Sequence, residues 1–86
     1  MSGSYYTSLC RAWIDHEIID IPSEKERLVE MCSDERSLER VSEWVIDKIQ
    51  NADNGNSTVR CLQDCIEKID FIIIAKGLCK EYDIYL

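Results

Sequence analysis

The stretch STVRCLQDCIEKIDFIIIAKGLCKEYDIYL, residues 57–86, decides how this chain folds, because it is apolar on two sides. Read as one helix from about residue 58, it repeats apolar side chains at three- and four-residue steps, the pattern of a core-facing stripe. That stripe comprises Leu62, Cys65, Ile66, Ile69, Ile72 and Ile73. A second apolar stripe, roughly opposite at about 100° per residue, comprises Phe71, Ile74, Ala75, Leu78 and Tyr82.

A helix that is apolar on both sides must be covered on both sides. One interpretation places helix 58–82 at the centre of the fold, wrapped by the other helices. The other makes the second stripe an oligomer or partner interface, since an exposed apolar stripe is costly to leave in water. A two-fold homodimer is the commonest arrangement of this kind. The residues proposed for that interface are Phe71, Ile74, Leu78 and Tyr82.

The rest of the chain predicts three more helices, at residues 5–20, 24–32 and 35–50. The core stripe of the third comprises Leu38, Val41, Val45 and Ile49. Ser23 and Glu26 have the spacing of a capping box at the start of the second helix. One kinked helix over 24–50 is the alternative, and 71–75 could also form a short buried strand. The helix interpretation is favoured because no second segment has a strand pattern to pair with it.

We therefore expect an all-α fold: a single domain over residues 1–86, built as a compact antiparallel bundle of three to four helices. A polar loop at 51–57 precedes the last helix, which Asn56 or Ser57 would cap. The tail, residues 82–86, is expected to pack back as an extended segment.

Charge is distributed unevenly along the 86 residues, whose formal net charge is −7. Residues 1–56 carry 12 acidic and 6 basic side chains, whereas residues 57–86 carry 5 and 4. Such a field repels nucleic acid and anionic membranes and favours a partner protein with a basic surface. We therefore expect neither direct nucleic-acid binding nor membrane binding.

A row of four carboxylates is the most specific pattern in the acidic part. Glu35, Glu39, Glu43 and Asp47 recur at four-residue steps, which spaces them about 6 Å apart on a helix. That spacing is close to that of phosphates along a nucleic-acid strand. The simpler interpretation is a solvated helix face, with its repulsion relieved by pairs between Arg36 and Glu39 and between Arg40 and Glu43. Trp44 and Ile46 lie on opposite flanks of the core stripe of this helix, and one of them is expected to be a partly exposed apolar anchor; Trp44 is the one assigned to the site.

No residue pattern predicts catalysis, a metal or a cofactor. The odd number of cysteines (Cys10, Cys32, Cys61, Cys65 and Cys79) indicates buried thiols in a reducing, cytoplasmic compartment. Cys61 and Cys65 share a helix face, but structural zinc sites use two tighter pairs in loops. The lone His16 has no nucleophile placed beside it by any motif and is interpreted as a surface group.

The sequence thus favours a small, non-enzymatic, acidic protein that binds and regulates or inhibits another protein. The partner would be a protein with a basic surface, and proteins that themselves bind nucleic acid belong to the candidates. The alternative hypothesis is a structural subunit of a homo-oligomer or of a larger helical assembly.

Overall fold

The computed structural model describes residues 2–83 and consists of helices and connecting turns over that range. The α-helices are α1 (Ser2–Trp13), α2 (Pro22–Cys32), α3 (Ser37–Asn51), α4 (Ser57–Asp64) and α5 (Phe71–Tyr82). A π-helical turn, Ile14–Ile18, continues α1, and a 3₁₀ turn, Ile66–Lys68, follows α4. The all-α prediction is confirmed, and α2 and α3 are separate helices. Residues 84–86 of the predicted extended tail lie outside the described residues.

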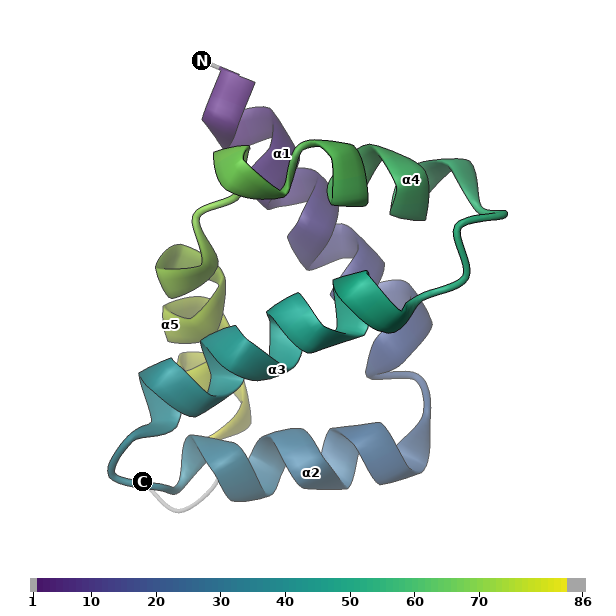
Figure 1. Cartoon of the computed structure of the whole chain (residues 1–86). Coiled ribbons are helices and arrows are strands. Elements are labelled where there is room, and N and C mark those ends of the chain that lie inside the picture. The colour runs from purple at the N-terminus through teal and green to yellow at the C-terminus, as the bar shows by residue number, and fades with distance from the viewer. Residues whose placement is uncertain (1, 84–86) are drawn as a thin grey trace.

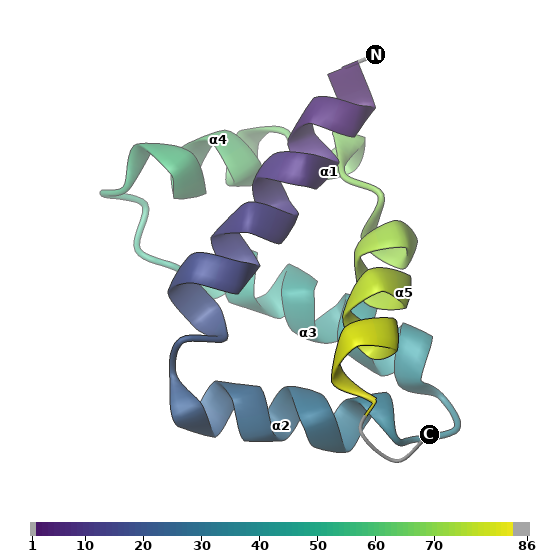
Figure 2. The same cartoon turned by 180° about the vertical axis from the view of Figure 1, so that it is seen from behind.

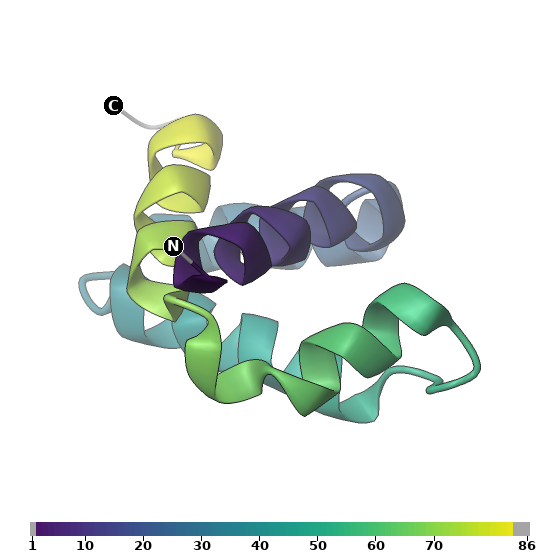
Figure 3. The same ribbon diagram turned by 90° about the horizontal axis from the view of Figure 1, so that it is seen from above.

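The helices cross one another and do not form the predicted antiparallel bundle of three to four helices. Helices α1 and α5 run across the direction of α2, α3 and α4 (Figure 1), and the view from behind agrees (Figure 2). The most extensive packing joins α3 to α5; α2 also packs on both, and α1 packs on α4, α5 and the 3₁₀ turn. Seen from above, α5 lies at the side of the molecule opposite the loop between α3 and α4 (Figure 3).

The predicted helix 58–82 is wrong, because the chain breaks it after α4. Ile69 has extended backbone angles (φ −89°, ψ 130°), and α5 begins only at Phe71. Asp70 caps the new helix: its Oδ1 accepts a hydrogen bond from the backbone N–H of Ile73 at 3.2 Å. The backbone N–H of Asp70 in turn donates to Oγ1 of Thr7 on α1, at 2.9 Å. The break is therefore fixed both locally and by α1.

Because of this break, the buried and exposed faces of α5 are the reverse of the predicted ones. Ile74 and Leu78, assigned to the second stripe, are 2% and 0% exposed, whereas Ile72 and Ile73, assigned to the core stripe, are 47% and 59% exposed. A helix that restarts at Phe71 has its own direction, so the register carried over from α4 does not apply to it. For Ile74 and Leu78 the internal-core interpretation holds.

One core joins all five helices. Its central members on α3, Val41, Val45 and Ile49, were predicted from the helical spacing, whereas Leu38 is 37% exposed. The hydrophobic residues buried in the described chain are Cys10, Trp13, Ile14, Ile19, Leu28, Cys32, Val41, Trp44, Val45, Ile49, Val59, Leu62, Ile69, Ile74, Ala75 and Leu78.

Helix starts also differ from the predicted ones for local reasons. The capping box at Ser23 does not form: α2 begins at Pro22, whose fixed φ suits the first helical position, and Ile21 is the N-cap. Before α4, Asn56 is the cap, and its Oδ1 accepts the N–H of Thr58 at 2.8 Å. Asn56 was one of the two predicted caps.

The exchange of faces predicts opposite stability effects on α5. Leu78→Ala should lower the free energy of unfolding by about 2–5 kcal/mol, because it leaves a cavity in the core. Ile72→Ala should change it by no more than about 0.5 kcal/mol, because this side chain lies at the surface. Urea denaturation followed by circular dichroism measures both. Equal losses in the two variants would contradict the assignment of the faces.

Candidate functional site

Three members of the predicted acidic row share the outer face of α3. Glu39, Glu43 and Asp47 are exposed, and their helical positions lie on the side opposite the buried Val41 and Ile49. Glu35 is exposed too, but it lies in the turn before the helix, because α3 begins at Ser37 and not at residue 35. The row on the helix is therefore one residue shorter than predicted.

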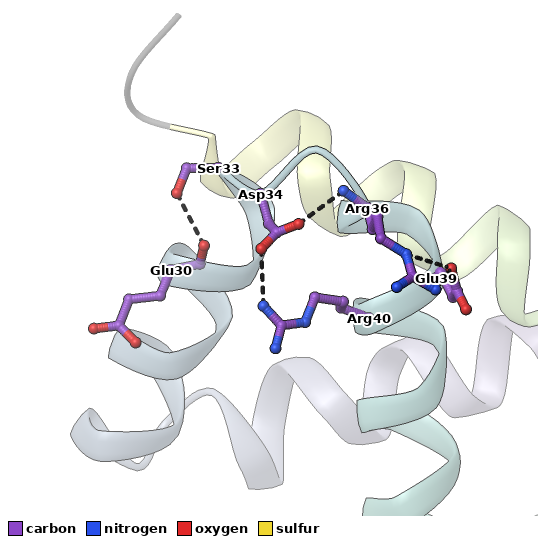
Figure 4. A network of polar contacts seen from close by, with 6 residues as sticks. All are labelled: Glu30, Ser33, Asp34, Arg36, Glu39 and Arg40. Atoms are coloured by element: carbon purple, nitrogen blue, oxygen red, sulfur yellow. Dashed lines mark hydrogen bonds and ion pairs between the residues drawn. The ribbon is translucent and has the colours of Figure 1, made fainter.

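Only one of the two arginines that were expected to neutralise the row pairs with it. Arg36 pairs with Glu39, with Nη2 and Oε2 2.6 Å apart, as predicted. Arg40 does not pair with Glu43; its Nη1 lies 2.8 Å from Oδ2 of Asp34 (Figure 4). The pKa of Asp34 is lowered, first by the backbone N–H of Arg36 and then by Arg40.

Two neighbouring carboxylates consequently form no ion pair. In the described part of the chain, neither Glu43 nor Asp47 has a Lys, Arg or His nitrogen within the 4.0 Å limit of an ion pair. Oδ1 of Asp47 accepts a neutral hydrogen bond from the Asn51 amide at 2.8 Å. These two side chains, one helical turn apart, form the part of the row most available to a basic group from outside.

Of the two anchor candidates, Ile46 is partly exposed and Trp44 is buried. Trp44 is 6% exposed, and its indole N–H donates to Oε2 of Glu24 at 3.2 Å. The ring forms part of a shallow, open groove between α2 and α3 that Met31, Glu43 and Asp47 also line. Arg27 and Arg40 complete the lining, so the groove is mixed in charge while the outer face of α3 is acidic.

Glu24 connects α2 to α3 in a way that the sequence pattern did not reveal. Oε2 of Glu24 lies 2.7 Å from Nζ of Lys48, and both side chains are mostly buried, at 18% and 24% exposed. The hydrogen bond from Lys48 is the main cause that lowers the pKa of Glu24, and the indole of Trp44 adds to it. Contacts 20 or more residues apart in sequence leave no periodic signal, so this pair follows only from the fold.

The residues of the predicted apolar interface lie in the core or at its margin. Ile74 and Leu78 are buried, and Phe71 and Tyr82 are partly buried against the same core. The carbonyl of Phe71 accepts a hydrogen bond from the hydroxyl of Ser42 on α3, at 3.4 Å. In this fold the stripe packs against other helices of the same chain.

The cysteines are free thiols, two of them buried. Burial raises the pKa of Cys10 and of Cys32 to about 12, which suits inert core thiols. Cys61 and Cys65 are partly buried on α4 and after it, and a hydrogen bond with Cys65 raises the pKa of the Tyr6 hydroxyl. Among residues 2–83, no three His, Cys, Asp or Glu side chains gather as a metal site would require.

His16 is exposed on the π-helical turn, as predicted for a surface group. That turn is closed by the N–H of Ile19, which donates to the carbonyl of Ile14 at 2.9 Å. Within the described range, no helix has the length and apolar character needed to cross a membrane.

Comparison with known proteins gives no relative: no family model, curated protein or solved structure matches this chain.

The Glu24–Lys48 ion pair predicts a pH-dependent contribution to stability. Because the folded chain lowers the pKa of Glu24 below its ordinary value of 4.5, the contribution is complete above that value. It is lost as the pH falls through the lowered pKa. Glu24→Gln keeps an acceptor for the Trp44 indole but removes the charge, so it should cost about 1–2 kcal/mol at pH 7.

Urea denaturation between pH 3 and pH 7 tests this. The difference between wild type and Glu24→Gln should shrink toward pH 3, and Glu26→Gln, an exposed carboxylate on the same helix, is the matched control. A difference that stays constant with pH would show that the charge of Glu24 contributes nothing.

Proposed function

We propose that this chain is a non-enzymatic binding protein that attaches to a basic partner protein through the outer face of α3 and thereby regulates or inhibits it. The observation that carries the proposal is the pair Glu43 and Asp47, exposed on one helix face without an ion-pair partner. Carboxylates that are already paired inside a protein have little to offer a partner, whereas these two form no ion pair in the described part of the chain.

The charge of the rest of the molecule supports the same partner class. The net charge of residues 1–56 is −6, and the outer face of α3 belongs to that part of the chain. A field of this sign accelerates encounters with a basic surface and orients it before contact. It also disfavours nucleic acid itself as the ligand.

The spacing along the row indicates a more specific form of the proposal. Glu39, Glu43 and Asp47 lie four residues apart, which corresponds to steps of about 6 Å along the helix. A groove that binds a phosphate backbone presents Lys and Arg side chains at comparable intervals. The chain would then act by occupying such a groove in a nucleic-acid-binding protein and excluding its nucleic acid.

In this more specific form of the proposal, the apolar contribution to binding comes from the groove beside the row and not from an exposed indole. Met31, which is partly exposed, and Trp44, which is buried, both line the groove. A partner side chain that enters between α2 and α3 would meet these two side chains together with Glu43 and Asp47. Arginine fits this combination, because its guanidinium pairs with carboxylates and stacks on aromatic rings.

Neutralising the acidic face tests the proposal. The face variant carries Glu35→Gln, Glu39→Gln, Glu43→Gln and Asp47→Asn. A control variant removes four exposed carboxylates elsewhere: Glu17→Gln, Asp53→Asn, Asp64→Asn and Glu67→Gln. Both variants change the net charge equally, so a difference between them reports position and not total charge.

Each tagged form is used to capture proteins from a lysate of the source cells, with quantitative mass spectrometry. A protein retained by wild type and control should be lost from the face variant by about tenfold or more at low salt, and rising salt should release it. Loss of the captured protein from both variants would show that binding depends on net charge and not on the position of the carboxylates. Equal capture by all three forms would exclude the α3 face as the binding site.

A further inference from the structure

Two of the cysteines lie together in the fold although they are far apart in the sequence. Cys32 is the last residue of α2, and Cys79 lies in the last turn of α5, where the two helices pack on each other (Figures 1 and 2). The thiol of Cys32 donates to the carbonyl oxygen of Leu78, 3.8 Å from Sγ. That carbonyl belongs to the peptide unit that joins Leu78 to Cys79. A hydrogen bond also joins the two thiols.

We propose that Cys32 and Cys79 form a reversible disulfide that clamps α2 to α5 when a low-molecular-weight disulfide such as oxidised glutathione is in excess. A disulfide spans α-carbons that lie about 4–7 Å apart, so it forms only between cysteines whose backbones are already neighbours. The contact of Cys32 with the peptide unit next to Cys79, together with the bond between the thiols, makes them such neighbours.

The reaction consists of two successive thiol–disulfide exchanges. The thiolate of Cys79 first attacks one sulfur of oxidised glutathione, which forms a mixed disulfide and releases one glutathione thiolate. The thiolate of Cys32 then attacks the sulfur of Cys79 and releases the second glutathione. Two protein thiols are oxidised and the S–S bond of glutathione is reduced. The two protons that the cysteines lose are taken up by the two glutathione thiolates.

Burial of the two side chains determines the order of these steps. Cys32 is 4% exposed, and its pKa is raised to about 12, first by burial and then by Cys79, so it does not react first with an oxidant in solution. Cys79 is partly exposed at the margin of the core and can meet the oxidant. In the mixed disulfide Cys79 carries no charge, which removes the second cause of the raised pKa of Cys32. Contact between the two side chains favours the second, intramolecular attack.

The bond would act as a redox-sensitive clamp on the fold. It would close a loop that contains α3 and α4, and it would tie the end of α2 to the helix on which α3 packs. A cross-link of this kind stabilises a protein mainly by restricting the unfolded chain. Oxidation should therefore make the chain more resistant to unfolding, and reduction should reverse the effect. The clamp does not depend on the proposed function, and its test involves no partner protein.

Peptide mapping of the oxidised chain tests the pairing. The purified, folded chain is incubated with excess oxidised glutathione, its remaining thiols are alkylated, and tryptic peptides are analysed by mass spectrometry. Cys32 and Cys79 fall in different tryptic peptides, 28–36 and 77–80. The link between these two peptides should be at least tenfold more abundant than any other disulfide.

The same oxidation in concentrated urea is the control for the role of the fold. Cys61 and Cys65 share the tryptic peptide 61–68 and lie only four residues apart. Because short loops close most easily in an unfolded chain, the bond between these two cysteines should become the main product in urea.

Urea denaturation measures the effect of the clamp on stability. Oxidation should raise the urea midpoint of wild type by at least about 1 M, and Cys79→Ser should abolish this shift. Cys61→Ser, which removes another partly buried thiol, is the matched control and should keep the shift. Peptide mapping uses wild type alone, so it decides the pairing even if Cys79→Ser disturbs folding.

Any one of three results contradicts the clamp. The first is folded wild type that yields no link between peptides 28–36 and 77–80 in excess oxidised glutathione. The second is a link that is equally abundant in the folded and the urea-unfolded chain. The third is an oxidised wild type that unfolds at the same urea concentration as the reduced one.

Discussion

The structure depends on one interruption of the chain, the turn at residues 65–70 that ends α4 and starts α5. Extended backbone at Ile69, the cap from Asp70 and the bond from Asp70 N–H to Thr7 on α1 hold it together. This turn gives α5 a direction of its own, across α3. A continuous helix would have continued in the direction of α4 and could not have placed Ile74 and Leu78 against α3. The central packing of the fold, α3 on α5, thus follows from a few hydrogen bonds at one turn.

Helix positions with a clear single-sided pattern could be predicted from the sequence. The stripe Val41, Val45 and Ile49 on α3 is buried as its spacing indicates, and Asn56 caps α4. The break could not be derived from periodicity, because a stretch that is apolar on both sides fits any helical register. One local signal was present: Asp70 directly before an apolar run is a favourable N-cap.

For the candidate acidic face, too, the local helical spacing could be predicted from the sequence, whereas the long-range contacts could not. The four-residue spacing of Glu39, Glu43 and Asp47 is a property of any helix and is retained. The pairing of acidic and basic side chains depends on the turn before α3, where Arg40 pairs with Asp34 and not with Glu43. Glu24 accepts from the Trp44 indole and pairs with Lys48, and only the packing of α2 on α3 brings these side chains together. In this fold Glu43 and Asp47 form no ion pair in the described part of the chain, and Trp44 is buried in the wall of a groove.

Backbone chemical shifts of the isolated chain, measured by nuclear magnetic resonance, test the central claim most directly. We expect helical ¹³Cα and ¹³Cβ shifts for Ser57–Asp64 and Phe71–Tyr82, separated by extended values at Ile69 and Asp70. The amide of Asp70 should exchange slowly, because it donates to Thr7. Helical shifts that run without interruption from residue 57 to residue 82 would contradict the break and, with it, the assignment of the buried and exposed faces of α5.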